Sequence, residues 1–177
     1  MRLDPKHFNL FLGICAAITA IAIFLFTVLY VSNQQETFRE EIGNIELSEW
    51  KMFHFASGDS ISTDQFKGSP VIIHFWSTWS DMSMKINEEL HQLEQNTDDI
   101  VVIAAAARDG DKLVKEYMNS VPYNFVFVNG TKLYQSLMVP GLPSQLYVNR
   151  DGDIVDHLVG DDPGKREQKI QSLLGRY

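Results

Sequence analysis

The hydrophobic pattern of the chain opens with one long uncharged apolar run, from Leu10 to Val31. A helix rises about 1.5 Å per residue, so a helix over this run crosses the roughly 30 Å hydrocarbon layer of a bilayer. A cleaved signal peptide is the alternative, but its apolar region usually covers only about 7 to 15 residues. The pattern therefore predicts a transmembrane signal anchor at residues 10–31, with Asp4-Pro5 at the start of its helix.

The flanks of this run predict its orientation and the division of the chain. Arg2 and Lys6 precede the run, whereas Arg39 is the one cation in the acidic stretch that follows it. Cations favour the cytoplasmic side of a membrane, so the later part of the chain should lie outside the cytoplasm. The predicted parts are a cytoplasmic flank at residues 1–9, the anchor at 10–31, a polar tether at 32–49, and a periplasmic or other extracytoplasmic domain at 50–177.

Beyond Trp50, short apolar runs alternate with helical patterns. Val71 to Trp76 is almost continuously apolar, which is typical of a strand covered on both faces. The predicted strands lie at Trp50–Ile61 (a hairpin around Ser57-Gly58-Asp59), Val71–Trp76, Ile100–Ala106, Phe125–Val128, Gln145–Asn149 and Asp153–Val159, the last two joined by an Asp151-Gly152 turn. The predicted helices lie at Thr63–Lys67 (one turn), Ser80–Gln95, Asp109–Ser120, Lys132–Leu137 and Pro163–Leu174. This order predicts an α/β domain with a central mixed sheet, helices on both faces and an N-terminal β-hairpin.

Composition narrows the possible partners. With 45% apolar residues the chain can bury an ordinary core, and its formal net charge of −8 disfavours a nucleic-acid partner. The histidines show no metal-ligand spacing, so we expect neither a metal nor another cofactor. The acids are scattered, which is typical of a solvated surface.

Two segments resemble a known family. They are Phe75-Trp76-Ser77-Thr78-Trp79-Ser80-Asp81-Met82-Ser83 and Val139-Pro140-Gly141-Leu142-Pro143-Ser144-Gln145-Leu146-Tyr147-Val148. Together they resemble the membrane-anchored thiol-disulfide oxidoreductases of bacteria, of the TlpA and ResA type, over about Trp50 to Leu174. The resemblance implies a thioredoxin-like fold, a cis-proline at Pro143, and a Cys-x-x-Cys position that is occupied here by Ser80-Asp81-Met82-Ser83.

The serines remove the chemistry that the resemblance implies. Exchange needs a thiolate that attacks a disulfide sulfur, and the single cysteine, Cys15, lies inside the predicted anchor. What Ser80 can do is cap the following helix by accepting from the N–H near Ser83, while Asp81 favours the positive helix end. A hydrolase role for Ser80 has little support, because His74 is six residues earlier in a strand and no Gly-x-Ser-x-Gly elbow is present. We interpret His74 as a hydrogen-bonded core histidine.

Other positions also depart from the family. The third residue after the second cysteine is commonly glutamate and the fifth is proline, whereas this chain has Ile86 and Glu88 there. An engineered replacement of two cysteines would leave these neighbours unchanged. We therefore favour natural loss of the cysteines over engineering.

A site without thiols can still bind a partner. In the relatives the residue before the cis-proline presents its backbone to an extended peptide, a role that here falls to Leu142. The candidate peptide-binding residues are Trp79, Ser80, Asp81, Met82, Leu142 and Pro143, with Met138 as a further rim residue and Trp76 as core. The first hypothesis is a redox-inactive, membrane-tethered domain that binds a protein partner in the cell envelope as a scaffold, assembly factor or complex subunit. The alternative is an oxidoreductase whose natural form has cysteines at positions 80 and 83; a peroxiredoxin-like reductase is weaker, since it too needs a missing cysteine.

Overall fold

The computed structural model describes residues 5–97 and 99–175, and the chain divides into two compact units between Thr37 and Phe38. The predicted helix cap Asp4 and the flanking Arg2 lie outside the described residues. Helix α1 runs from Pro5 to Asn44, and its part up to Thr37 makes up the described portion of the first unit.

The first unit is an apolar helix. From Phe8 onward α1 is long and apolar enough to cross a membrane, judged by length and composition. Two polar side chains of its apolar part find partners on the helix itself, since the hydroxyls of Thr19 and Thr27 donate to the carbonyls of Cys15 and Ile23. These properties suit the predicted membrane anchor, while its orientation stays a prediction.

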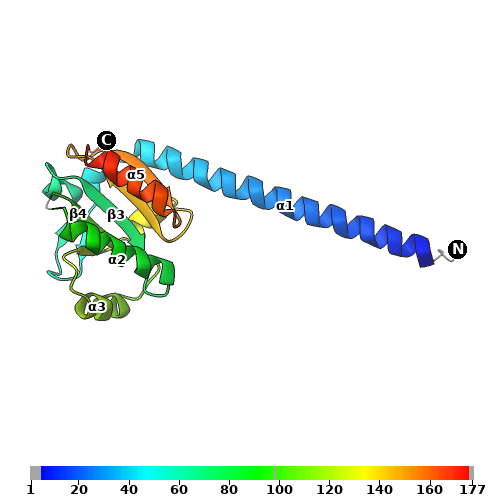
Figure 1. Cartoon of the computed structure of the whole chain (residues 1–177), viewed down its shortest axis with the longest axis horizontal. Helices are drawn as coiled ribbons and strands as arrows, with labels where there is room; N and C mark the ends of the chain where they lie inside the picture. Colours follow the sequence, from blue (N-terminus) through cyan, green and yellow to red (C-terminus); the bar gives the residue numbers. More distant parts are fainter. Residues whose placement is uncertain (1–4, 98, 176–177) are drawn as a thin grey trace. The chain divides into compact units, whose positions relative to one another are not determined.

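The second unit contains a seven-stranded mixed sheet in the order β2-β1-β5-β4-β3-β6-β7 (Figure 1). The strands are β1 (Met52–His54), β2 (Ser60–Ile61), β3 (Val71–Trp76), β4 (Val101–Ala106), β5 (Val126–Asn129), β6 (Ser144–Val148) and β7 (Ile154–Val159). The helices are α2 (Asp81–Gln95), α3 (Asp111–Ser120), α4 (Thr131–Ser136) and α5 (Pro163–Leu173), with short 3-10 turns η1 (Leu47–Glu49) and η2 (Thr63–Phe66). Strands β3, β4 and β5 are parallel, and the outer strands join them antiparallel, which confirms the predicted mixed sheet and N-terminal hairpin.

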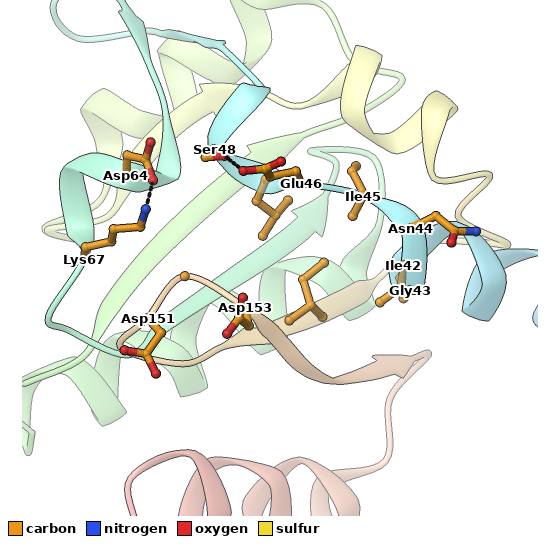
Figure 2. A pocket seen from close by; sticks show the side chains of 13 residues that line it. Ile42, Gly43, Asn44, Ile45, Glu46, Ser48, Asp64, Lys67, Asp151 and Asp153 are labelled. Atoms are coloured by element: carbon orange, nitrogen blue, oxygen red, sulfur yellow. Dashed lines mark hydrogen bonds and ion pairs between the residues drawn. The ribbon is translucent and has the colours of Figure 1, made fainter.

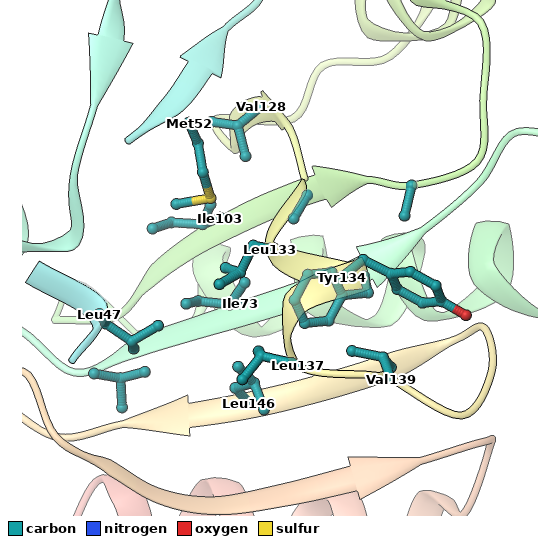
Figure 3. Close-up of a cluster of buried hydrophobic side chains, with 14 of the residues drawn as sticks. Leu47, Met52, Ile73, Ile103, Val128, Leu133, Tyr134, Leu137, Val139 and Leu146 are labelled. Carbon is teal, nitrogen blue, oxygen red and sulfur yellow. The ribbon is translucent and has the colours of Figure 1, made fainter. Parts of the chain in front are cut away.

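Strand β3 lies near the middle of this sheet, and all six of its residues are buried. Successive side chains of a strand point to opposite faces. Ile73 and Phe75 therefore belong to the cluster that α4 covers, whereas Ile72 and Trp76 belong to the cluster that α2, α3 and α5 cover. Figure 3 shows Ile73 in the first cluster, together with Leu133 and Leu137 at the helix α4 side.

Buried Arg166 joins α5 to α2 on the second face. Its guanidinium donates to Asp161 at 2.9 Å and to Glu89, and Lys85 completes the group by donating to Asp161 at 3.3 Å. A buried cation is tolerated when carboxylates pair with it. The pattern of apolar residues predicted both helices but not this ionic contact between them.

The segment predicted as a polar tether, residues 32–49, is largely helical. Helix α1 continues to Asn44 and η1 follows, and both Phe38 and Leu47 are buried in the core of the second unit. The ring of Phe38 packs edge-on against His157 of β7, with 5.2 Å between centroids. An isolated apolar residue among polar ones gives little periodic signal, and burial of Phe38 and Leu47 explains why this polar segment is ordered.

We expect Phe38→Ala to lower the free energy of unfolding of the second unit by about 3–5 kcal/mol, because the buried ring leaves a cavity. Phe53→Ala is the matched control, since Phe53 is 40% exposed and its loss should cost about 1 kcal/mol or less. Denaturant unfolding of the full chain in detergent micelles measures both. Equal losses for the two variants would contradict the core role of Phe38.

Candidate functional site

The candidate site lies where the parallel strands β3, β4 and β5 end. Ligand sites in open α/β sheets commonly form outside the carboxyl ends of the strands. Three connections meet there: residues 77–80 between β3 and α2, residues 107–110 between β4 and α3, and residue 130 between β5 and α4. A fourth segment joins them, because Ser144 pairs with Phe75 in the β3–β6 ladder and so brings Pro143 beside the end of β3.

Helix α2 begins at this edge with a side-chain cap. Ser80 has an extended backbone, and its hydroxyl accepts from the backbone N–H of Ser83 at 3.2 Å. Asp81 lies in the first turn, where a negative charge favours the positive end of the helix. The predicted capping role of Ser80 is confirmed.

Asp109 joins the β3–α2 connection to the β4–α3 connection. One carboxylate oxygen accepts from the Ser77 hydroxyl at 3.0 Å and from the Thr78 N–H at 2.5 Å, and the other accepts from the Gly110 N–H at 2.8 Å. Burial alone would raise the pKa of Asp109, but these hydrogen bonds outweigh it and hold the pKa below its usual value. The sequence marked Asp109 only as a helix boundary, because its partners lie about thirty positions away in the chain.

Large apolar side chains are exposed around this junction. Trp79 is 64% exposed, Met82 is 47% exposed and Met138 is 57% exposed. The indole N–H of Trp79 donates to the carbonyl of Arg108 at 3.1 Å, and the Arg108 guanidinium lies 5.2 Å from the centre of the Tyr134 ring. These contacts connect the β3–α2 loop, through the β4–α3 loop, to α4.

Leu142 and Pro143 complete the site. The Leu142–Pro143 peptide bond is cis, Leu142 is half-buried against the core, and Pro143 is buried. Trp76, in contrast, is fully buried and belongs to the core as expected. We call the exposed side chains Trp79, Met82, Arg108 and Met138, together with half-buried Leu142, the loop-end surface.

His74 lies beneath this surface and is fully buried. Burial lowers the pKa of His74 to about 4, and the nearby backbone of Ser83 and Ser144 opposes this shift only in part. The backbone of Ser83 and Ser144 therefore gives His74 only weak hydrogen bonding, and among the described residues neither ring nitrogen has a partner of ordinary hydrogen-bond geometry. The buried hydroxyl of Ser83 also has none there, so the two predicted serines differ in their surroundings.

A separate pocket of about 330 Å³ lies between the end of α1, η1, η2 and the β6–β7 turn (Figure 2). It is lined by four carboxylates, from Glu46, Asp64, Asp151 and Asp153. Asp64 is paired with Lys67 at 2.6 Å, and nowhere in residues 5–97 and 99–175 do three potential metal-ligating side chains lie close enough together to hold one metal ion. We therefore centre the candidate site on the loop-end surface.

Comparison with known proteins finds relatives that are named as thiol-disulfide oxidoreductases and as a glutaredoxin. No family model matches the chain. It is 26% identical over 108 residues to the thiol-disulfide oxidoreductase ResA of Bacillus thuringiensis (strain Al Hakam), which covers 59% of this chain and 62% of that protein. The chain thus matches less than two thirds of the length of this relative.

Solved structures share the fold at low sequence identity. A putative thiol:disulfide interchange protein DsbE from Chlorobium tepidum has a TM-score of 0.61 and 20% identity, covering 71% of this chain and 93% of that one. StoA from Bacillus subtilis has a TM-score of 0.55 and 18% identity, covering 70% and 95%. These structures confirm the predicted thioredoxin-like fold.

The two serines should respond differently to the same substitution. Ser80→Ala removes the cap of α2 and should lower the free energy of unfolding by about 1 kcal/mol. Ser83→Ala removes a buried hydroxyl that has no partner among the described residues, so the change should stay within about 0.5 kcal/mol. Denaturant unfolding of the full chain measures both values, and a larger loss for Ser83→Ala would contradict the capping assignment.

The burial of His74 predicts a dependence of stability on pH. Its pKa falls from 6.5 to about 4 on folding, so the folded state binds fewer protons between these values. The stabilising contribution is fully present above pH 6.5 and is lost as the pH falls toward 4, by on the order of a few kcal/mol. His74→Gln should flatten this part of the curve of unfolding free energy against pH, with His54→Gln in the β1–β2 hairpin as control. Parallel curves for the native chain and His74→Gln would show that His74 is not the group responsible.

Proposed function

The chain carries a thioredoxin-like domain of the TlpA/ResA type, and from this premise we propose that it is a membrane-tethered domain that binds a protein partner without thiol chemistry. In this proposal Ser80 and Ser83 stand at the positions of the cysteine pair, and an extended segment of the partner lies on the loop-end surface. The domain then acts as a scaffold, an assembly factor or a subunit of an envelope complex.

The cysteine content supports the absence of exchange. Thiol-disulfide exchange forms and breaks sulfur–sulfur bonds, and a serine hydroxyl can neither form that bond nor ionise near neutral pH as a cysteine does. The single cysteine of the chain, Cys15, lies in the apolar part of α1. The domain therefore has no thiol with which to perform the reaction named in its relatives.

The observation that carries the binding proposal is the exposure of Trp79 before α2, of Met82 in its first turn and of Met138 after α4. Monomeric soluble domains rarely leave large apolar side chains together in water unless they contact something. Trp79 offers a flat apolar face with a polar edge, and the flexible side chains of Met82 and Met138 can adapt to different partner shapes. Asp109 ties the β3–α2 connection, which carries Trp79 and leads into Met82, to the β4–α3 connection, so this part of the surface is held in place before a partner arrives.

The location of the domain forms part of the proposal. Residues 10–31 of α1 hold the chain in the cytoplasmic membrane, residues 1–9 are cytoplasmic, and the domain lies on the periplasmic or extracytoplasmic side. The acidic net charge of −8 favours a protein partner over nucleic acid. No metal or other cofactor is required for binding of this kind.

A thiol-disulfide oxidoreductase is the competing function, and the name of the Bacillus relative favours it. It requires that the natural protein carry cysteines at positions 80 and 83. The codons of the native gene decide between the two, since serine codons at both positions leave only the binding function.

Site-specific crosslinking tests the binding proposal. We expect a photoreactive phenylalanine at position 82, in the full chain in its native membrane, to form an adduct with a protein partner. Leu142→Asp should abolish that adduct, because a charge would replace the half-buried apolar side chain beside Pro143. The same photoreactive residue at Val155, which is 54% exposed on β7, is the matched control and should give no such adduct. An adduct at position 82 that survives Leu142→Asp, or one that appears equally at position 155, would contradict binding at the loop-end surface.

A further inference from the structure

Two residues of the loop-end surface have an uncommon backbone conformation. Arg108 and Met138 have φ values of 56° and 50°, and they are the only non-glycine residues with positive φ in the described part of the chain. This left-handed region places the Cβ atom close to the backbone, so glycine usually occupies it. Two residues other than glycine have this conformation on the same surface, which indicates that their side chains have a function there.

Met138 stands where a helix normally ends in glycine. The N–H of Met138 donates to Gln135 at 3.0 Å and the N–H of Val139 donates to Tyr134 at 3.1 Å, which is the hydrogen-bond pattern of a Schellman motif at the end of α4. Tyr134 and Val139 supply the buried apolar contact of that motif (Figure 3). Met138 itself is 57% exposed, so the thioether does little for the packing of the domain.

Arg108 is an exposed cation in the β4–α3 connection. In residues 5–97 and 99–175 no Asp or Glu forms an ion pair with it. The neighbouring carboxylate of Asp109 is occupied by Ser77, Thr78 and Gly110. The guanidinium of Arg108 lies over the ring of Tyr134, and such a contact with a ring face leaves its N–H groups available to a ligand.

The two ends of the loop-end surface carry opposite charges. Asp81 is exposed at the start of α2, next to Met82, whereas Arg108 is exposed beside Trp79 in the β4–α3 loop. A partner that carried acids throughout would be repelled at the Asp81 end. A single carboxylate placed at the Arg108 end avoids that repulsion and meets a planar donor that binds carboxylates through two parallel hydrogen bonds.

We propose that Arg108 and Met138 determine the specificity of the loop-end surface, and that its partner is an extended polypeptide segment with a carboxylate side chain close to a large apolar one. The carboxylate binds Arg108, and the apolar side chain lies against Met138 and Trp79. This inference rests on the proposed function, because it names the chemistry of the partner that the same surface binds.

Selection of peptides by the full chain in lipid nanodiscs tests this chemistry. The probe is a display library of random twelve-residue peptides, selected in parallel against the native chain and against Leu142→Asp. Peptides enriched by the native chain should contain Asp or Glu within two residues of Phe, Leu, Met or Trp. Replacing that acid by its amide, and making Arg108→Gly, should each weaken binding about tenfold or more.

The two changes should not add, because each removes the same contact. Arg108→Gly and Met138→Gly both relieve the left-handed conformation, so the thermal midpoint should stay the same or rise while binding falls. Lys67→Gln removes one exposed positive charge at the opposite edge of the sheet, before β3 begins, and should leave binding unchanged.

Two results would overturn these assignments in distinguishable ways. The first result is a set of enriched peptides that shows no preference for acids, or an amide peptide whose binding is weakened equally on the native chain and on Arg108→Gly. Either outcome would refute the roles of Arg108 and Met138 and leave peptide binding intact. The second result is that the native chain enriches peptides no more strongly than Leu142→Asp does. This would refute the proposed function itself, and the inference with it.

Discussion

The burial of β3 on both faces is the constraint on which the rest of the domain depends. Its six side chains alternate between two apolar clusters, and parallel and antiparallel neighbours hold its edges. Because β3 is fixed in this way, its last residue has a defined position at the edge of the sheet. Ser80 caps α2 at that point, and the pairing of Phe75 with Ser144 brings Pro143 beside it. The site is therefore a consequence of the core and does not need sulfur to keep its shape.

The loops at this edge are held by polar contacts that a redox reaction would not require. Asp109 ties Ser77 and Thr78 to the next loop, and the carbonyl of Arg108 receives the indole of Trp79. Ordered loops that expose apolar side chains and a free guanidinium are suited to recognition, since little conformational freedom is lost on binding. The serines at positions 80 and 83 and this framework are compatible with the proposed binding role of the domain.

The sequence predicted those features that follow from local patterns. Continuous apolar runs located β3 and β4, and a serine before a helical pattern located the start of α2. Features that depend on distant contacts were missed: the hydrogen bonds of Asp109, the ionic contacts of Arg166 and the burial of Phe38 in a segment expected to be a tether. The left-handed backbones of Arg108 and Met138 were missed for another reason, because neither residue type signals a positive φ as glycine does.

Binding without thiols is the central claim, and a chain with no thiol tests it most directly. Cys15→Ser removes the only sulfur able to form a disulfide. The measurement is the yield of the crosslinked partner at position 82, in native membranes, with and without a reductant such as dithiothreitol. Binding without thiols predicts the same partner at the same yield from the native chain and from Cys15→Ser, in both conditions. A partner that is lost in Cys15→Ser, or released by the reductant before crosslinking, would contradict it.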